Sequence, residues 1–65
     1  MQVTINQATH DLPAGASVAD AIARIGAKPP LAVAVNTAFV PHTRYALHAL
    51  QEGDRVEIIA PVTGG

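Results

Sequence analysis

Arg55-Val56-Glu57-Ile58-Ile59-Ala60 is followed by Pro61-Val62-Thr63-Gly64-Gly65, and we interpret the rest of the chain as a platform for this end. Residues 55–60 alternate with the period of a β-strand. Such a strand places Val56, Ile58 and Ala60 on one face, and it places the apolar Ile59 beside the charged Arg55 and Glu57 on the other. The pattern predicts a strand with one buried face and an apolar residue, Ile59, available to dock a partner.

Gly64 and Gly65 add no side chains to the end of this stretch. Because neither residue has a Cβ, we expect a flexible tail over 62–65 that enters a narrow channel, with the Gly65 carboxyl carbon open to attack. Val62, Thr63 and Gly64 would give the Gly65 carboxylate access to a partner's buried site, since the four tail residues extend at most about 13 Å. The alternative is an ordinary frayed end; two terminal glycines arise by chance in roughly 1 chain in 200.

The composition allows one small domain, 1–65, with an aliphatic core. Hydrophobic residues make up 49% of the 65 residues and aromatic residues only 3%. The chain has no cysteine. A disulfide framework is therefore excluded, and no side chain can carry sulfur as a thiolate or persulfide.

Charge and hydropathy exclude two further classes. The four basic and five acidic residues give a net charge of -1, and the basic residues are scattered and form no stripe for nucleic acid. No apolar run reaches the length of a membrane span, and the alternating first residues lack the features of a signal peptide. We therefore expect a cytoplasmic protein, monomeric between encounters because no large apolar face beyond the core is evident.

The first half of the chain shows two strands and then a helix. Alternation over 1–6 predicts a strand, Asn6-Gln7 a turn, and 8–12 a returning strand. Ser17 is placed as an N-cap with Asp20 three residues later, and Gly26 follows the last apolar position, so we predict a helix over 18–25. The apolar residues of that helix, spaced to share one face, are Val18, Ile22 and Ile25.

The second half contains shorter elements. Residues 31–35 form an apolar run that predicts a strand, Asn36-Thr37 a turn, and 39–40 a brief strand before Pro41. Leu47 and Leu50 are spaced for a helical turn, so we expect a short helix or 3₁₀ turn within 43–50, which Thr43 would cap. Gly53 stands where a tight turn needs a positive φ. The predicted core consists of Val3, Ile5, Val18, Ile22, Ile25, Val33, Val35, Val56 and Ile58.

These elements predict the α+β class, with one amphipathic helix packed on a mixed four- to five-stranded sheet. Side chains outside the core offer little chemistry. None of the three histidines has a His or Cys partner at metal-ligand spacing, so we predict no metal site and no bound cofactor. Ser17 is explained as a helix cap and lacks an evident base to make it a nucleophile. Ile59, with Phe39 and Val40, remains as a candidate docking surface, although single exposed apolar residues are common.

The chain resembles the sulfur carrier proteins of thiamine biosynthesis, the ThiS family, over essentially its whole length. The resemblance rests on a glycine before a capped helix, a Val-Asn turn, a Val-Pro step followed by an aromatic residue, a Gly-Asp-x-Val before the last strand, and a final Gly-Gly. These are Gly15-Ala16-Ser17-Val18, Val35-Asn36, Val40-Pro41 with Tyr45, Leu50 with Gly53-Asp54-Arg55-Val56-Glu57-Ile58, and Gly64-Gly65. Two features depart from the family pattern. Asn36-Thr37 stands where many relatives have Asn-Gly, and Pro61 resembles the proline in the Pro-Pro-Val-x-Gly-Gly ending of molybdopterin synthase small subunits.

The resemblance implies a ubiquitin-like β-grasp fold with the first and last strands side by side at the centre of the sheet. It also implies that the chain is a carrier and not an enzyme. An E1-like adenylyltransferase would join Gly65 to AMP using ATP and Mg²⁺. Sulfur from a donor such as a cysteine desulfurase would then leave a thiocarboxylate on Gly65, and thiazole synthase would build that sulfur into the thiazole ring of thiamine.

Three alternatives stay open at this point. The chain could be the small subunit of molybdopterin synthase, which uses the same chemistry at its C-terminal glycine for a different substrate. A ubiquitin-like modifier would instead join Gly65 to protein lysines, and Lys28, the single lysine, argues weakly against such a role because it leaves few acceptors on the chain itself. A passive β-grasp interaction module would use neither chemistry.

Overall fold

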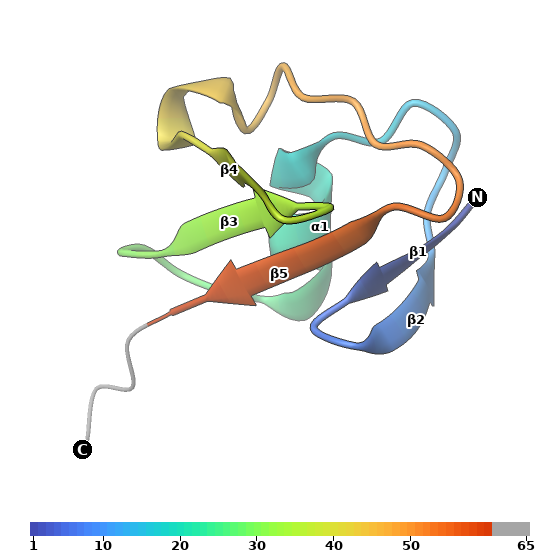
Figure 1. The fold of residues 1–65 in the computed structure, drawn as a ribbon, viewed down its shortest axis with the longest axis horizontal. Coiled ribbons are helices and arrows are strands. Elements are labelled where there is room, and N and C mark those ends of the chain that lie inside the picture. The colour runs from blue at the N-terminus through green and yellow to red at the C-terminus, as the bar shows by residue number, and fades with distance from the viewer. Residues whose placement is uncertain (61–65) are drawn as a thin grey trace.

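A five-stranded mixed sheet organises the computed structural model, which describes residues 1–60. The strand order is β2-β1-β5-β3-β4. β5 is central: it runs parallel to β1 and antiparallel to β3 (Figure 1). The predicted mixed sheet with adjacent first and last strands is confirmed, and it is a ubiquitin-like β-grasp. The strands are β1 Gln2–Ile5, β2 Ala8–Asp11, β3 Ala32–Val35, β4 Ala38–Val40 and β5 Arg55–Ile59.

Two hairpins flank β5, and both have two-residue turns in the left-handed region. Asn6 and Gln7 have φ values of 51° and 72°, and Asn36 and Thr37 have values of 50° and 71°. Two successive positive φ angles match the right-handed twist of the strands they connect. Asparagine adopts this conformation more readily than most residues, because its short polar side chain finds local hydrogen bonds. Each turn therefore places an asparagine beside one end of β5.

The helix α1, Val18–Ile25, has the predicted bounds. A capping box forms at its start: the Ser17 Oγ accepts from the Asp20 N–H, and the Asp20 carboxylate accepts from the Ser17 N–H at 2.8 Å. At its end, Gly26 has φ 70° and donates its N–H to the last turn. Neither α1 nor the short 3₁₀ helix within residues 1–60 has the length and apolar character needed to cross a membrane.

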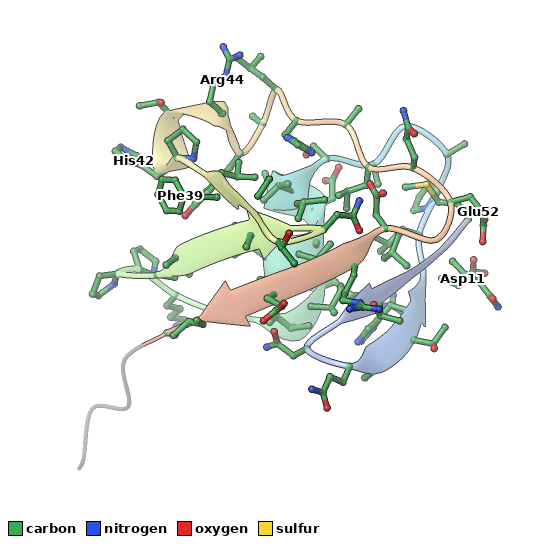
Figure 2. All side chains as sticks on the ribbon, viewed as in Figure 1. Asp11, Phe39, His42, Arg44 and Glu52 are labelled. Carbon is green, nitrogen blue, oxygen red and sulfur yellow. The ribbon has the colours of Figure 1, made fainter. Side chains whose placement is uncertain are left out.

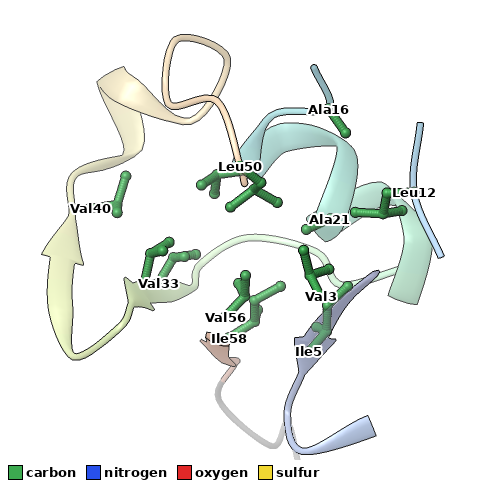
Figure 3. Close-up of a cluster of buried hydrophobic side chains, with 12 residues drawn as sticks. Val3, Ile5, Leu12, Ala16, Ala21, Val33, Val40, Leu50, Val56 and Ile58 are labelled. Carbon is green, nitrogen blue, oxygen red and sulfur yellow. The ribbon is translucent and has the colours of Figure 1, made fainter. Parts of the chain in front are cut away.

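One core lies between α1 and the inner face of the sheet (Figure 3). Most of the predicted core residues are buried, but Ile22 is only partly buried and Ile25, in the last turn of α1, is 36% exposed. Ala21 is fully buried, so the small residue of the helix face is covered completely, whereas Ile25 in the last turn is not. Five buried residues were not predicted, because they lie in loops or in poorly patterned segments or are small: Leu12, Ala16, Ala21, Val40 and Leu50.

The segment between β4 and β5 differs from the prediction. It contains a 3₁₀ helix, η1 His42–Arg44, which starts after Pro41 and has no side-chain cap. The 3₁₀ turn expected within 43–50 is therefore present, but it begins one residue earlier and ends at Arg44, and the prediction of Thr43 as its cap is wrong because Thr43 lies inside it. Leu47 is 72% exposed, whereas Leu50 is buried. The Leu50 N–H donates to the Ala16 carbonyl at 2.8 Å, which fixes this loop to the start of α1.

Candidate functional site

The chain leaves the sheet at the end of β5, and the predicted carrier residues follow from there. Gly65, Gly64, Thr63 and Val62 lie outside the described residues, as does the flexibility predicted for 62–65. The described part of the candidate site is the end of β5 with the surface around it.

β5 brings the chain to this end between two neighbours. Ile58 points into the core and is 6% exposed, while Ile59 points to the outer face and is 67% exposed. Val33 and Ala32 of β3 are the register partners of Ile58 and Ile59. The alternation predicted for β5 is confirmed through Ile59. β1 pairs only with Arg55 and Val56 at the start of β5, whereas β3 pairs with β5 as far as Ile59, so β3 is the backbone neighbour at the end of the strand.

The outer face of the sheet carries exposed apolar side chains. α1 covers the opposite face, and in residues 1–60 no helix covers this one (Figure 1). Phe39 is 70% exposed and lies on β4 opposite Ala34 of β3, so β3 separates it from β5. Ile59 lies opposite Ala32, which is also on this face. Figure 2 places Phe39 toward the end of the molecule from which the chain leaves β5.

A shallow apolar hollow adjoins Ile59. Pro30, Leu31 and Ala32 line it together with Ile59. The lining is almost entirely apolar, and Ala32 contributes the smallest of its side chains. We define the outer apolar surface as Phe39, Ile59 and this hollow.

Val40 does not belong to the outer apolar surface. It was expected to dock a partner with Ile59 and Phe39, but it is only 3% exposed and pairs with Val33 on the inner face. Because neighbouring residues of a strand point to opposite faces, exposed Phe39 requires buried Val40. The docking expectation is wrong for Val40, and for Ile59 and Phe39 it stays a prediction.

The other half of the outer face is polar. A hollow there is lined by Thr4, Asn6, Gln7, Arg55 and Glu57. Arg55 and Glu57 are exposed on β5 next to Ile59. The outer face therefore changes from charged and polar at the β1 side to apolar at the β3 and β4 side.

Side chains in residues 1–60 offer no evident catalytic or metal site. In this part of the chain no three His, Cys, Asp or Glu side chains gather to hold a metal ion. Ser17 is engaged in the capping box of α1, where its hydroxyl also contacts the Asp20 carboxylate at 3.1 Å. The end of β5 therefore remains the candidate site in the described part of the chain.

Comparison with known proteins identifies the family. The model of the ThiS family matches residues 2–65. The chain belongs to the ThiS family. Among solved structures, a thiamine biosynthesis protein (ThiS) from Geobacter metallireducens is similar with a TM-score of 0.79 and 17% identity, over 100% of each chain. At that identity the likeness concerns the fold. No curated protein matches the chain.

Membership in the ThiS family supports a sulfur carrier role in thiamine biosynthesis and is consistent with a protein that is not an enzyme. It also implies encounters with an adenylyltransferase of the ThiF type and with a thiazole synthase. The ThiS resemblance found in the sequence motifs is confirmed by the family match. The match extends to Gly64 and Gly65, the two residues in which the predicted carrier site lies.

Proposed function

We propose that this ThiS-family chain carries sulfur as a thiocarboxylate on Gly65 for the thiazole ring of thiamine. The observation that carries the proposal is the family match over residues 2–65, which includes the final glycine pair. The absence of cysteine adds support, because no side chain of this protein can hold transferable sulfur. The protein is a cosubstrate in this account, and its partners supply the catalytic groups.

The first step activates the carboxylate. A terminal carboxyl group has a pKa of about 3.3–3.7, so at neutral pH it is an anion and a poor electrophile. The adenylyltransferase binds ATP and Mg²⁺, and a Gly65 oxygen attacks the α-phosphorus. An acyl–O–P bond forms, the bond to pyrophosphate breaks, and the product is an acyl adenylate with AMP as its leaving group.

The second step introduces sulfur. A persulfide, such as that of a cysteine desulfurase, attacks the Gly65 carbonyl carbon, the C–O bond to AMP breaks, and an acyl disulfide forms. A thiol then attacks the donor's sulfur, so the S–S bond breaks and the thiocarboxylate leaves while the two partner thiols become a disulfide. Because the chain has no cysteine, that thiol belongs to a partner.

The outer apolar surface is proposed as the docking face for the adenylyltransferase. Ile59 supports this proposal because it is an exposed apolar residue at the end of β5, the strand after which the chain continues toward Gly65. Phe39 and Ile59 are large and well exposed, and buried aromatic and aliphatic anchors supply much of the binding energy at protein interfaces. Arg55 and Glu57 would lie at the polar rim of that contact.

The mass of the intact protein tests the carrier function. The chain is incubated with a ThiF-type adenylyltransferase, ATP, Mg²⁺ and a sulfur donor. Replacement of one oxygen by sulfur raises the mass by about 16 Da. Without ATP no gain is expected. A wild-type chain that gains no mass, but instead forms covalent adducts with other proteins, would refute the carrier function in favour of a modifier.

Removal of Gly65 tests the site. We expect a chain of residues 1–64 to lose sulfur loading completely and to unfold at the same denaturant concentration as the full chain, since the core lies within residues 3–58. A shortened chain that still gains the mass of sulfur would show that Gly65 is not the carrier residue.

A genetic experiment separates the two sulfur-carrier pathways. Loss of the protein is expected to create a thiamine requirement. Loss of molybdoenzyme activity without a thiamine requirement would instead assign it to molybdopterin synthesis.

A further inference from the structure

The backbone pairing between β1 and β5 stops before β5 ends. The two strands share only two register pairs, Thr4 with Arg55 and Ile5 with Val56. The last backbone bond runs from the Asn6 N–H to the Val56 carbonyl at 2.9 Å. After Asn6 the chain turns into the β1–β2 hairpin. The remaining residues of β5 therefore have no backbone partner from β1.

The side chain of Asn6 continues the pairing. Its Nδ2 donates to the Ile58 carbonyl at 3.0 Å, and its Oδ1 accepts from the Ile58 N–H at 2.8 Å. A carboxamide carries the same donor and acceptor as a peptide group, so it substitutes for the missing backbone. Both bonds are partly buried, which protects them from competition with water. Ile58 is thus held by Asn6 on one side and lies beside Val33 on the other.

A second asparagine holds the opposite end of β5. The Asn36 Oδ1 accepts from the Arg55 N–H at 2.9 Å, and the Asn36 N–H donates to the Arg55 carbonyl at 2.8 Å. Asn36 occupies the β3–β4 turn with φ 50°, as Asn6 occupies the β1–β2 turn with φ 51°. The two residues are matched in type and backbone conformation. They differ in position, because only Asn6 contacts the part of β5 next to the chain's exit.

We propose that Asn6 is a positioning residue, whose side chain fixes the end of β5 and thereby the direction in which the chain continues toward Gly65. The contacts of Asn6 with Ile58 support the positioning itself. The expected effect on sulfur loading rests on the proposed function. Released from Asn6, Ile58 keeps only its β3 neighbour, so the following residues sample more directions. Fewer encounters with the adenylyltransferase then present the carboxylate in a reactive geometry.

The variants are chosen to preserve the turns. Asn6→Gly keeps the positive φ of the turn and removes both side-chain bonds. Asn36→Gly does the same at the start of β5 and is the matched control. Asn6→Asp is a second variant: it tolerates the left-handed turn and keeps an acceptor for the Ile58 N–H, but it replaces the donor by an oxygen that repels the Ile58 carbonyl. It decides the question should Asn6→Gly fail to fold.

The first measurement is independent of any enzyme. Amide ¹⁵N relaxation on the full chain gives backbone order parameters for Ile59 and Ala60. We expect them to fall from the range of a rigid backbone, about 0.85, toward about 0.6 in Asn6→Gly. In Asn36→Gly they stay at wild-type values, and in Asn6→Asp they fall as well, because the carboxylate no longer donates to the Ile58 carbonyl. Unchanged order parameters in both Asn6 variants overturn the proposal.

The second measurement is the kinetics of sulfur loading with the carrier as the varied substrate. We expect kcat to fall about tenfold in Asn6→Gly, while KM changes less than about twofold, since the docking surface is kept and only reactive presentation is lost. Asn36→Gly retains kcat. An equal loss of kcat in both glycine variants indicates general destabilisation and refutes a positioning role, as does a kcat that stays unchanged in Asn6→Gly.

The two proposals fail in different ways. If the wild-type chain gains no sulfur, the proposed function is refuted, and the order parameters alone decide whether Asn6 fixes the end of β5. If the wild-type chain loads normally and Asn6→Gly loads at the same kcat, the carrier function stands and the positioning role is refuted.

Discussion

Individual side chains on the inner face of the sheet contribute unequally to stability, and their burial decides how much. Ile5 is 1% exposed, whereas Ile25 is 36% exposed although it stands on the predicted apolar face of α1. Periodicity identifies the face of a helix but not how far along the helix the opposing sheet extends. Burial beyond that limit depends on tertiary packing, which no local pattern encodes.

The two isoleucines give a matched test of this difference. Ile5→Val removes one methylene from a fully packed site, and we expect the free energy of unfolding to fall by about 0.5–1.5 kcal/mol. Ile25→Val removes the same group from a partly exposed site and should cost less than half as much. Urea denaturation measures both, and the midpoint should shift without a change of slope. Equal losses would contradict the assigned core.

Asn6 shows what a sequence conceals at this scale. From the sequence, Asn6-Gln7 is a turn, and that prediction is confirmed by two positive φ angles. Its bonds to Ile58 join residues 52 positions apart, so no spacing rule points to them. Val40 is the opposite case, since its burial follows from the alternation of β4 once Phe39 is known to face outward. The docking prediction failed there because the strand's two faces were not separated.

Among the elements, α1 was predicted to the residue because its ends carry explicit signals. Ser17 with Asp20 starts it and Gly26 ends it, and each acts through bonds within a few residues. The segment after Pro41 lacks such signals. There the Leu47 and Leu50 spacing suggested a helical turn that buries both leucines, but the 3₁₀ helix ends at Arg44. Leu50 is buried and its N–H donates to the distant Ala16 carbonyl, whereas Leu47 is 72% exposed. Local signals therefore predicted the bounds of α1, whose caps act within a few residues. They did not predict the burial in the segment after Pro41, which depends on residues that are distant in the sequence.

The cap of α1 provides the test at this scale. Ser17→Ala removes the acceptor for the Asp20 N–H, and we expect a loss of about 0.5–2 kcal/mol in the free energy of unfolding. Ser17→Gly should cost less than Ser17→Ala, because glycine is itself favourable at an N-cap. Thermal and urea unfolding measure both variants. A glycine variant less stable than the alanine variant would show that the hydroxyl stabilises something other than the helix start.

At the scale of the whole molecule, the two faces of the sheet differ in burial. The inner face packs on α1 and accounts for the core, while no helix of residues 1–60 covers the outer face, which carries Phe39 (Figure 2) and Ile59. β5 belongs to both, since Ile58 points inward and Ile59 outward. In the proposed function, this central strand would connect the outer apolar surface, as the docking face, to the residues that lead to Gly65. The sequence predicted the α+β class, and the family resemblance supplied the central position of the adjacent first and last strands, because their pairing joins distant segments.

Substitutions on the outer apolar surface test this docking role. Ile59→Ser and Phe39→Ser remove large side chains that are 67% and 70% exposed, so each should change the free energy of unfolding by no more than about 0.5 kcal/mol. If this surface docks the adenylyltransferase, each variant loses an apolar anchor worth about 1.4 kcal/mol or more, which raises KM for sulfur loading about tenfold. Because the reacting groups are untouched, kcat should remain near the wild-type value.

Leu47 supplies the control for that experiment. It is an aliphatic residue, 72% exposed, and it lies in the loop before β5 and not on the sheet. Leu47→Ser therefore lowers surface hydrophobicity to a similar extent without altering the outer apolar surface, and its KM should match that of the wild type. A KM raised equally by Leu47→Ser would show that general surface hydrophobicity, and not this face, governs the encounter. A KM unchanged in all three variants would place the docking surface elsewhere, with the polar hollow around Arg55 and Glu57 as the next region to substitute.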